Sequence, residues 1–310
     1  MNMQNGQLAD WGFHDGELTV QRRAGVRADA ERLTGMLAPV GLRGGVAGFL
    51  ADRTFAVITA RDDAGSLWSS PLIGEPGFLT VTSPTTLRIR TNVAHGDPLD
   101  AAPAGQPVGL VVMEFAAGRR LRINGTLTGS DNDGLTVEVE QAYGNCPQYI
   151  QQRNLAPNPG SRPDLEEPRS DVELSGEDAA QIRSADTFFL GTAHPTRGKD
   201  ASHRGGPAGF VRLESNDVWW PDYPGNNMFN SFGNLTIDPT AALLFVDFDS
   251  GRTLQLSGIA SIEWDHRGEA GDDGHTGRRA HFHTERLVAG HLPGIRQTEH
   301  HFYPRNPAIT

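Results

Sequence analysis

The sequence has few cysteines, few lysines and no long apolar runs. Cys146 is the only cysteine among 310 residues, so no disulfide can form within the chain. No run of about 18 apolar residues occurs, so we expect no transmembrane helix. The segment Met1–Asp10 is polar and lacks the basic and apolar regions of a secretory signal. These absences favour a soluble protein of the cytoplasm.

Positive charge is also scarce. The chain has 27 basic and 38 acidic residues, and its formal net charge is -11. This balance argues against a general binder of nucleic acid or of anionic membranes. Lys199 is the only lysine, so a Schiff base with a carbonyl compound could form at this residue alone.

Glycine and proline are abundant, and the chain repeats itself. With 37 Gly and 20 Pro, short strands and turns are favoured over long helices. Thr54–Ala60 resembles Thr187–Ala193, and Glu114–Gly125 resembles Asp247–Gly258, both at a separation of 133 positions. Two blocks at one spacing indicate two copies of one fold.

The pattern within each copy predicts strands and few helices. Short apolar or β-branched runs alternate with Gly-containing turns, as in antiparallel hairpins. The strands predicted are Thr54–Arg61, Phe78–Thr82, Thr86–Thr91, Val108–Phe115, Leu121–Thr128, Thr187–His194, Phe210–Leu213, Asp217–Trp220, Ala241–Phe248 and Thr253–Trp264. The helices predicted are Arg27–Leu37, Gln141–Asn154 and Gly176–Ala185, the last with Ser175 as cap and Asp178 at the capping-box position. The fold class is mainly β, with one small barrel per copy.

The expected domain order follows from this repeat. It comprises an N-terminal extension with a helix (1–42), a first barrel (43–155), a proline-rich linker (156–174) and a second barrel with a His-rich tail (175–310). Four prolines between Ala156 and Asp171 predict an extended segment without helix or sheet.

Two stretches of the second copy carry chemistry. Trp219–Asn234 combines two tryptophans, a Pro/Gly turn, four asparagines and a serine, which suits a polar ligand with a flat ring but also a long self-capping turn. His203 and Arg204 precede two glycines, and an arginine fork is a natural partner of a phosphate. The alternative is a surface hairpin with a solvated arginine. The first copy has Ser70 and Pro71 at these positions, so the charge is present in one copy only.

These residues resemble the pyridoxamine 5′-phosphate oxidase-like family, the FMN-binding split barrels, and most of all its tandem branch. The matching stretches are Phe188–His194, Asp200–Gly206, Trp220–Asn227, Gly233–Leu235, Leu254–Gly258 and Tyr143–Gln151. The resemblance covers roughly residues 11–265. It implies two tandem split barrels that form an internal pseudo-dimer, with FMN bound between them.

The resemblance also implies roles for individual residues. Arg204 falls on the family's phosphate-binding arginine with His203 beside it, and Gln255 resembles a partner of the flavin's polar edge. Asn230 and Ser231 stand where the family usually has a basic pair. The cofactor-binding candidates are His203, Arg204, Trp220, Pro221, Asp222, Asn227, Asn230, Ser231 and Gln255.

A tyrosine and an arginine repeat the family's spacing for a substrate phosphate. Tyr149 and Arg153 lie four residues apart, so on the predicted helix they would share a face and bind one anion. The family's C-terminal Arg-Leu-Glu-Pro-type ending is absent, so pyridoxamine phosphate is not inferred as the substrate.

The resulting hypothesis is an FMN-dependent oxidoreductase that transfers hydride between flavin N5 and a small molecule or a nicotinamide cofactor, NADH or NADPH. His203 is the candidate catalytic residue, as a donor near the ring or phosphate. The alternative is a carrier or sensor without turnover that holds FMN, FAD, a deazaflavin or haem. A third reading is a barrel used only for protein assembly. Exposed faces on two barrels also suggest a homodimer.

The histidines of the tail and Cys146 are further candidates for chemistry. His281 and His283 alternate in a predicted strand and could ligate a metal, but no cysteine or carboxylate pattern joins them, so no metal site is expected. His300 or His301 would be the ligand if the protein binds haem. Cys146 precedes Pro147 at the start of the predicted helix, which suits either a small capping residue or a redox thiol.

Overall fold

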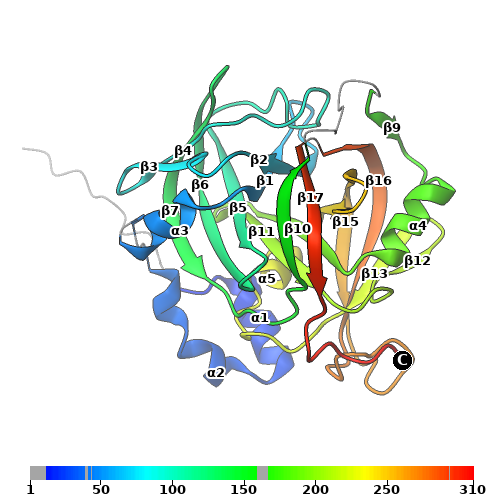
Figure 1. Ribbon diagram of the computed structural model, residues 1–310. Helices are drawn as coiled ribbons and strands as arrows, with labels where there is room; N and C mark the ends of the chain where they lie inside the picture. The colour runs from blue at the N-terminus through cyan, green and yellow to red at the C-terminus, as the bar shows by residue number, and fades with distance from the viewer. Residues whose placement is uncertain (1–11, 39–40, 43, 159–166, 293) are drawn as a thin grey trace, which may run out of the picture.

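The computed structural model describes residues 12–38, 41–42, 44–158, 167–292 and 294–310. Two antiparallel sheets dominate it (Figure 1). The first sheet contains β1 (Phe55–Arg61), β2 (Leu67–Ile73), β3 (Leu79–Ser83), β4 (Thr86–Ile89), β5 (Gln106–Glu114), β6 (Arg119–Asp131) and β7 (Gly134–Gly144). The second contains β10 (Thr187–His194), β11 (Gly198–Gly205), β12 (Arg212–Glu214), β13 (Asp217–Pro221), β14 (Thr240–Val246), β15 (Arg252–Glu263) and β16 (Arg279–His291), with β9 (Arg169–Asp171) paired to β16.

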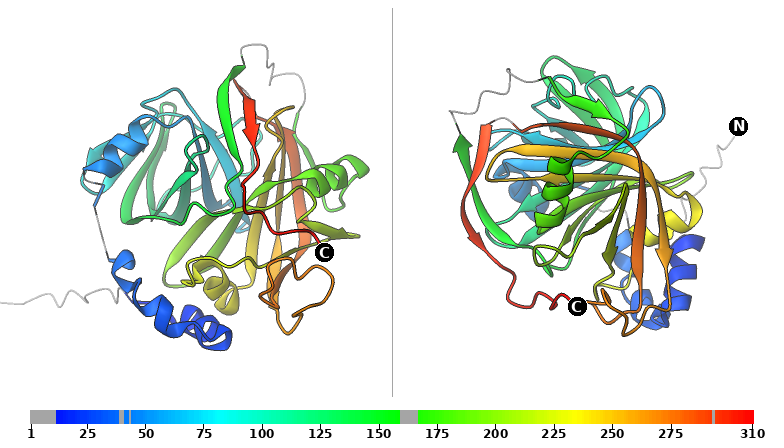
Figure 2. Two further views of the ribbon diagram at one scale, coloured as in Figure 1. Left: turned by 60° about the horizontal axis from the view of Figure 1, so that its bottom comes forward. Right: turned by 90° about the vertical axis from the view of Figure 1, so that its right-hand side faces the viewer.

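The two sheets have one topology. Their strand orders are β2-β1-β5-β6-β7-β4-β3 and β11-β10-β14-β15-β16-β13-β12, so each strand of the first sheet has a counterpart in the second. The fold class predicted from the sequence, mainly β with two tandem split barrels, is confirmed. The last strands of the two repeats, β8 (Gln152–Asn158) and β17 (Gly294–His301), pair with each other and stand between the barrels (Figure 2).

Each barrel has its own core, and a third apolar cluster joins the barrels. Side chains alternate along β1 and β10, so Ile58 and Phe188 point into the barrel cores while Phe55 and Phe189 meet between the barrels. Both faces of these strands are therefore buried, which explains their continuous apolar sequence. The barrels also approach closely, since a Cβ at Gly109 of β5 would lie 2.7 Å from the Asp200 backbone of β11.

Helices cover the barrel ends. They are α1 (Asp15–Ala24), α2 (Arg27–Glu31), a 3-10 turn (Thr34–Leu37), α3 (Gly45–Ala51), α4 (Gly176–Ser184) and α5 (Asn230–Ile237). The predicted capping box of α4 is present, because Ser175 and Asp178 bond to each other's backbone N–H groups. None of the helices in the described ranges is long and apolar enough to span a membrane.

Three local predictions were wrong. The helix predicted at Gln141–Asn154 is absent, because β7 continues to Gly144 with alternating burial and β8 begins at Gln152. Cys146 therefore lies in a loop and not at a helix start. The helix predicted at Arg27–Leu37 is interrupted, and consists of α2 and the 3-10 turn.

The predicted linker also contains strands. Pro157 lies in β8 opposite Ile295, and β9 begins at Arg169. Proline is tolerated in β8 because this strand pairs on one side only. The middle of the linker, residues 159–166, lies outside the described residues.

Candidate functional site

A groove runs between the barrels where β11 of the second barrel faces β6 of the first. It consists of two adjoining cavities of about 100 and 70 Å³, which share Arg122, Arg204, Tyr223, Gly225 and Asn226. We call these two cavities the arginine groove. The first barrel contributes Arg120 and Arg122 from β6, and the second contributes His203 and Arg204 from β11.

Four arginines line the arginine groove, and two of them, Arg122 and Arg278, form ion pairs with carboxylates. Arg122 donates to both carboxylate oxygens of Asp200, at 3.1 and 2.9 Å. Arg120 has no carboxylate partner among the described residues and donates instead to Nδ1 and the backbone oxygen of His203, at 2.9 and 3.2 Å. The Arg204 side chain makes no hydrogen bond or ion pair with any described residue, and its guanidinium lies 5.6 Å from the centre of the Phe232 ring.

The crowding of positive charge depresses two pKa values. Burial and the neighbouring arginines lower the pKa of Arg120 to about 9. Burial and Arg122 lower the pKa of Arg204 to about 10. Both side chains remain cationic at neutral pH, so an anion entering the groove would relieve their mutual repulsion.

Hydrogen-bond donors without acceptors cluster around the same groove. Enclosed donor atoms that find no acceptor among the described residues are Nε of Arg120, Arg122 and Arg204, Nε2 of His203, Nε1 of Trp220, Nδ2 of Asn145 and the Tyr223 hydroxyl. The residues carrying them all line the larger cavity. Each unsatisfied buried donor costs about 1–3 kcal/mol, so this concentration indicates a site built for a ligand rich in acceptors.

His203 is a fixed neutral donor. It is 3% exposed, and its Nδ1 accepts from Arg120, which leaves the ring proton on Nε2. Burial, together with Arg120, Arg153, Arg204 and Arg122, lowers its pKa well below the ordinary value. The imidazole therefore donates a hydrogen bond through Nε2 and does not exchange a proton near neutral pH.

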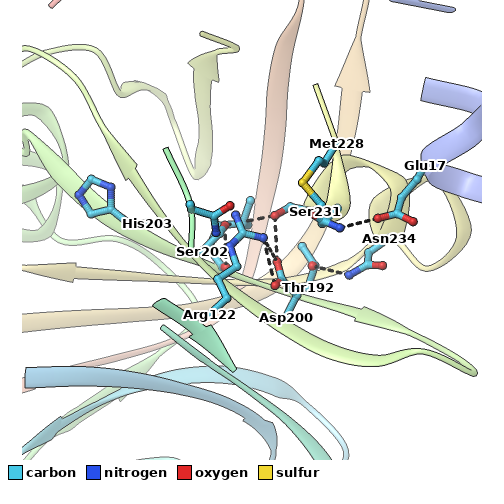
Figure 3. Close-up of polar contacts among 12 residues, drawn as sticks. Glu17, Arg122, Thr192, Asp200, Ser202, His203, Met228, Ser231 and Asn234 are labelled. Atoms are coloured by element: carbon cyan, nitrogen blue, oxygen red, sulfur yellow. Dashed lines mark hydrogen bonds and ion pairs between the residues drawn. The ribbon is translucent and has the colours of Figure 1, made fainter. Parts of the chain in front are cut away.

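Next to the groove lies a network of polar side chains that reaches Glu17 of α1 (Figure 3). Ser231 of α5 donates to Asp200 at 3.2 Å and lies 3.2 Å from Ser202. Glu17 of α1 accepts from Asn230 at 2.5 Å. Burial raises the pKa of Glu17 to about 7, so this carboxyl titrates near neutral pH.

Most of the residues predicted for the cofactor line the groove. His203, Arg204, Trp220 and Pro221 line the larger cavity, and Asp222, Asn227, Asn230 and Ser231 line the smaller one. Tyr149, predicted for the substrate, also lines the larger cavity. Asp222 is occupied by an ion pair with Arg278, at 2.8 Å.

Two predicted residues lie elsewhere. Gln255 hydrogen bonds to Ser70 at 2.9 Å and lines a separate cavity between the barrels, because β15 faces β2 rather than β11. Arg153 of β8 is buried in an ion pair with Asp186 at 2.6 Å, while the Tyr149 hydroxyl donates to the Pro224 carbonyl at 2.9 Å. Tyr149 and Arg153 therefore share neither a helix nor an anion site, because the segment that carries them is not helical.

The sequence analysis missed the two arginines of the first barrel. Arg120 and Arg122 lie in the repeated block Glu114–Gly125, where the second copy has Thr253 and Gln255 at the matching positions. The same comparison between copies that singled out His203 and Arg204 would have found them. Which barrel's groove they enter could not be known without the packing of the barrels.

The histidines of the tail do not form a metal centre in the described part of the chain. His281 and His283 share a face of β16, as predicted, and flank Asp217, with His283 Nδ1 2.6 Å from Oδ1. No group of three or more metal-ligating residues occurs among the residues described. His300 lies 2.9 Å from Asp186.

Comparison with known proteins identifies a family model that matches part of the chain. Residues 174–274, a third of the chain, match the family model of pyridoxamine 5′-phosphate oxidase. This range covers most of the second barrel and includes His203, Arg204 and α5. The resemblance predicted from the sequence is confirmed for this part of the chain. No curated protein matches the chain.

Several solved structures are similar to part of the chain. HupZ of Group A Streptococcus is 14% identical with a TM-score of 0.32, and covers 39% of this chain and 99% of its own. A Clostridium acetobutylicum protein related to general stress protein 26 is 14% identical with a TM-score of 0.30, covering 40% and 92%. HutZ, the heme storage protein from Vibrio cholerae, is 14% identical with a TM-score of 0.29, covering 39% and 97%.

Proposed function

We propose that this chain, whose second barrel is similar to the pyridoxamine 5′-phosphate oxidase family, binds FMN in the arginine groove and works as an FMN-dependent oxidoreductase. The observation that carries the proposal is the pair of guanidiniums, Arg120 and Arg204, that have no carboxylate partner among the described residues. Fixed positive charge with enclosed, unsatisfied donors fits a phosphate ester.

The residues of both barrels would hold the nucleotide together. Arg204 presents its planar fork from β11, and Arg120 supplies from the first barrel the second positive charge that the loop before α5 lacks. Trp220 and Tyr223 add neutral donors to the same wall. One chain thus contributes both sides of the groove, and the proposal requires no second copy.

FMN supplies hydride chemistry when it is bound, and the protein positions and tunes it. The role we assign to His203 is to donate a hydrogen bond through Nε2 without giving up its proton. Glu17 lies in a neighbouring cavity of about 40 Å³ that shares Asn230 with the groove. With a pKa of about 7, its carboxyl can hold or release a proton at neutral pH.

A second function is favoured by one observation. Within the arginine groove, Arg120, His203 and Arg204 all keep one protonation state near neutral pH. Three such side chains around the groove suit a protein that holds a flavin, FAD, a deazaflavin or haem as a carrier or sensor.

Two measurements separate these functions. Absorption spectra before and after FMN addition and desalting should show the two bands of oxidised flavin, near 370 and 450 nm, retained by the protein. The FMN-loaded protein should then oxidise NADH or NADPH in steady state. Retained flavin without turnover of either nucleotide would favour the carrier. A protein that does not retain FMN would contradict both uses of this cofactor.

A further inference from the structure

A second and larger cavity lies between the barrels on the opposite side of the interface. Its volume is about 540 Å³, which is within the usual range of small-molecule sites. Its lining comes from both barrels, and includes Pro71, Ile73 and Asp97 of the first and Gln255, Val288 and Leu292 of the second. We call it the β2–β15 cavity, after the strands that carry Pro71 and Gln255.

This cavity is the counterpart of the arginine groove under the internal repeat. Strand β2 corresponds to β11, and β15 corresponds to β6, since both sheets have the same order. Thr253 and Gln255 stand at the repeat positions of Arg120 and Arg122, and Pro71 stands at that of Arg204. Equivalent strands therefore line both cavities. In the β2–β15 cavity, uncharged residues replace all three of these arginines.

The charges around the β2–β15 cavity disfavour a phosphate. The lining contains the carboxylates Asp97 and Glu167 and the imidazoles His95 and His291, but neither Arg nor Lys. Asp97 accepts hydrogen bonds from Ser70 Oγ at 2.6 Å and from Gln255 Nε2 at 3.0 Å. A phosphate placed here would meet carboxylates without any cationic side chain in the lining to offset them.

Gln255 presents one acceptor to the cavity. Its Nε2 donates to Ser69 O at 3.1 Å, Ser70 Oγ at 2.9 Å and Asp97 Oδ2, and these three acceptors fix which end of the amide is the nitrogen. Among the described residues, none donates to Oε1. Pro71, Ile73, Val288 and Leu292 supply apolar walls around this acceptor.

We propose that the β2–β15 cavity is a second ligand site, which takes an uncharged heteroaromatic molecule without a phosphate group and accepts an N–H of that molecule at Gln255 Oε1. Its volume, its apolar walls, the absence of Arg and Lys from its lining and the amide oxygen of Gln255 define the ligand class. The proposal does not depend on FMN binding in the arginine groove.

Riboflavin and FMN form a matched pair of probes, because they differ only in the phosphate. The full-length protein is saturated with FMN, desalted, and titrated with riboflavin in equilibrium dialysis. We expect riboflavin to bind without displacing FMN.

In Gly290→Leu we expect at least a tenfold loss of riboflavin affinity, with FMN affinity unchanged. A Cβ at Gly290 comes no closer than 3.4 Å to Thr253 Oγ1, so the larger side chain extends into the cavity without backbone strain.

Two further variants distinguish binding at the β2–β15 cavity from binding at the arginine groove. Arg204→Ala should weaken FMN and leave riboflavin binding at the β2–β15 cavity unchanged. If Gly290→Leu does not fold, Ile73→Trp fills the opposite wall and should have the same effect. Riboflavin that fails to bind, that displaces FMN, or that binds equally well to both cavity-filling variants would overturn the second site. Loss of FMN binding alone would contradict the proposed function and not this inference.

Discussion

The ion pair with Asp200 distinguishes Arg122 from Arg120 and Arg204. Asp200 neutralises Arg122 at 2.9 Å, and no described carboxylate does the same for Arg120 or Arg204. The ligand-free protein therefore holds two cationic side chains whose mutual repulsion disfavours the fold. Binding of an anion is the natural compensation, so these residues trade stability for affinity.

This trade predicts opposite effects for two similar substitutions. Arg204→Met should stabilise the ligand-free protein by about 1 kcal/mol, because an unpaired cation is replaced by an apolar side chain of similar length. Arg122→Met should destabilise it by roughly 3–5 kcal/mol, because it leaves Asp200 buried without its partner. Urea unfolding without added ligand measures both changes. Equal destabilisation by the two substitutions would contradict the idea that Arg204 lacks a partner.

Glu17 predicts a dependence of stability on pH. Its pKa is raised from 4.5 to about 7 by burial, so between these values the folded state keeps a proton that the unfolded state has lost. Stability is therefore lost as the pH rises through this window, by roughly 3 kcal/mol in total.

His14 acts in the opposite sense, because burial lowers its pKa to about 4. Its contribution to the free energy of unfolding therefore grows as the pH rises from 4 to 6.5.

Glu17→Gln isolates the first of these effects. The difference in unfolding free energy between the variant and the native protein should move in favour of the variant by roughly 2–3 kcal/mol between pH 5 and pH 8. Denaturant unfolding at four or five pH values measures this slope. A difference independent of pH would show that Glu17 titrates normally.

At the scale of elements, β5 and β11 cross where the barrels touch. Gly109 has no room for a side chain, because a Cβ would lie 2.7 Å from Asp200 Cα. Gly109→Ala should therefore cost roughly 1–3 kcal/mol and weaken ligand binding, since it displaces Asp200 from Arg122. Gly129→Ala is the matched control on β6, where the nearest atom to the added Cβ is 3.8 Å away.

Unfolding free energy and FMN affinity of the two alanine variants test this crossing. We expect the Gly129 variant to stay within about 0.5 kcal/mol of the native protein. Two variants with the same stability and affinity would mean that the close approach of β5 and β11 is not required.

The elements that could be predicted are those whose pattern is local. Strand β10 matches its predicted bounds, and α4 was predicted from its capping box. Helix α5 was missed because Asn230 and Ser231 are residues of turns, and it is stabilised by packing against α1 rather than by propensity. The predicted helix after Gln141 failed because alternating burial in β7, which depends on the barrel, outweighed the local sequence.

At the scale of the whole molecule, the repeat predicted two barrels but not how they face each other. His203 and Arg204 were singled out by the asymmetry between the copies, and Trp220 by its stretch of aromatic and amide residues. Gln255 was predicted for the same groove but lines the other cavity, and Arg120 was missed, because both placements depend on how the barrels pack.

The same interface explains why one chain carries two unlike grooves. A symmetric pair of barrels would repeat its ligand site, but here Arg204 and Pro71 occupy equivalent positions. The arginine groove gathers positive charge and the β2–β15 cavity avoids it. The internal duplication has therefore produced two inter-barrel cavities that differ in charge.

The affinity for FMN, measured by quenching of flavin fluorescence, tests the central claim most directly. We expect Arg204→Ala to weaken binding by roughly 10- to 100-fold, the loss of a charge-assisted hydrogen-bonding partner. Arg32→Ala, which removes an exposed arginine far from the groove in sequence, should leave the affinity unchanged. If both variants bind FMN as tightly as the native protein, the arginine groove is not the phosphate site.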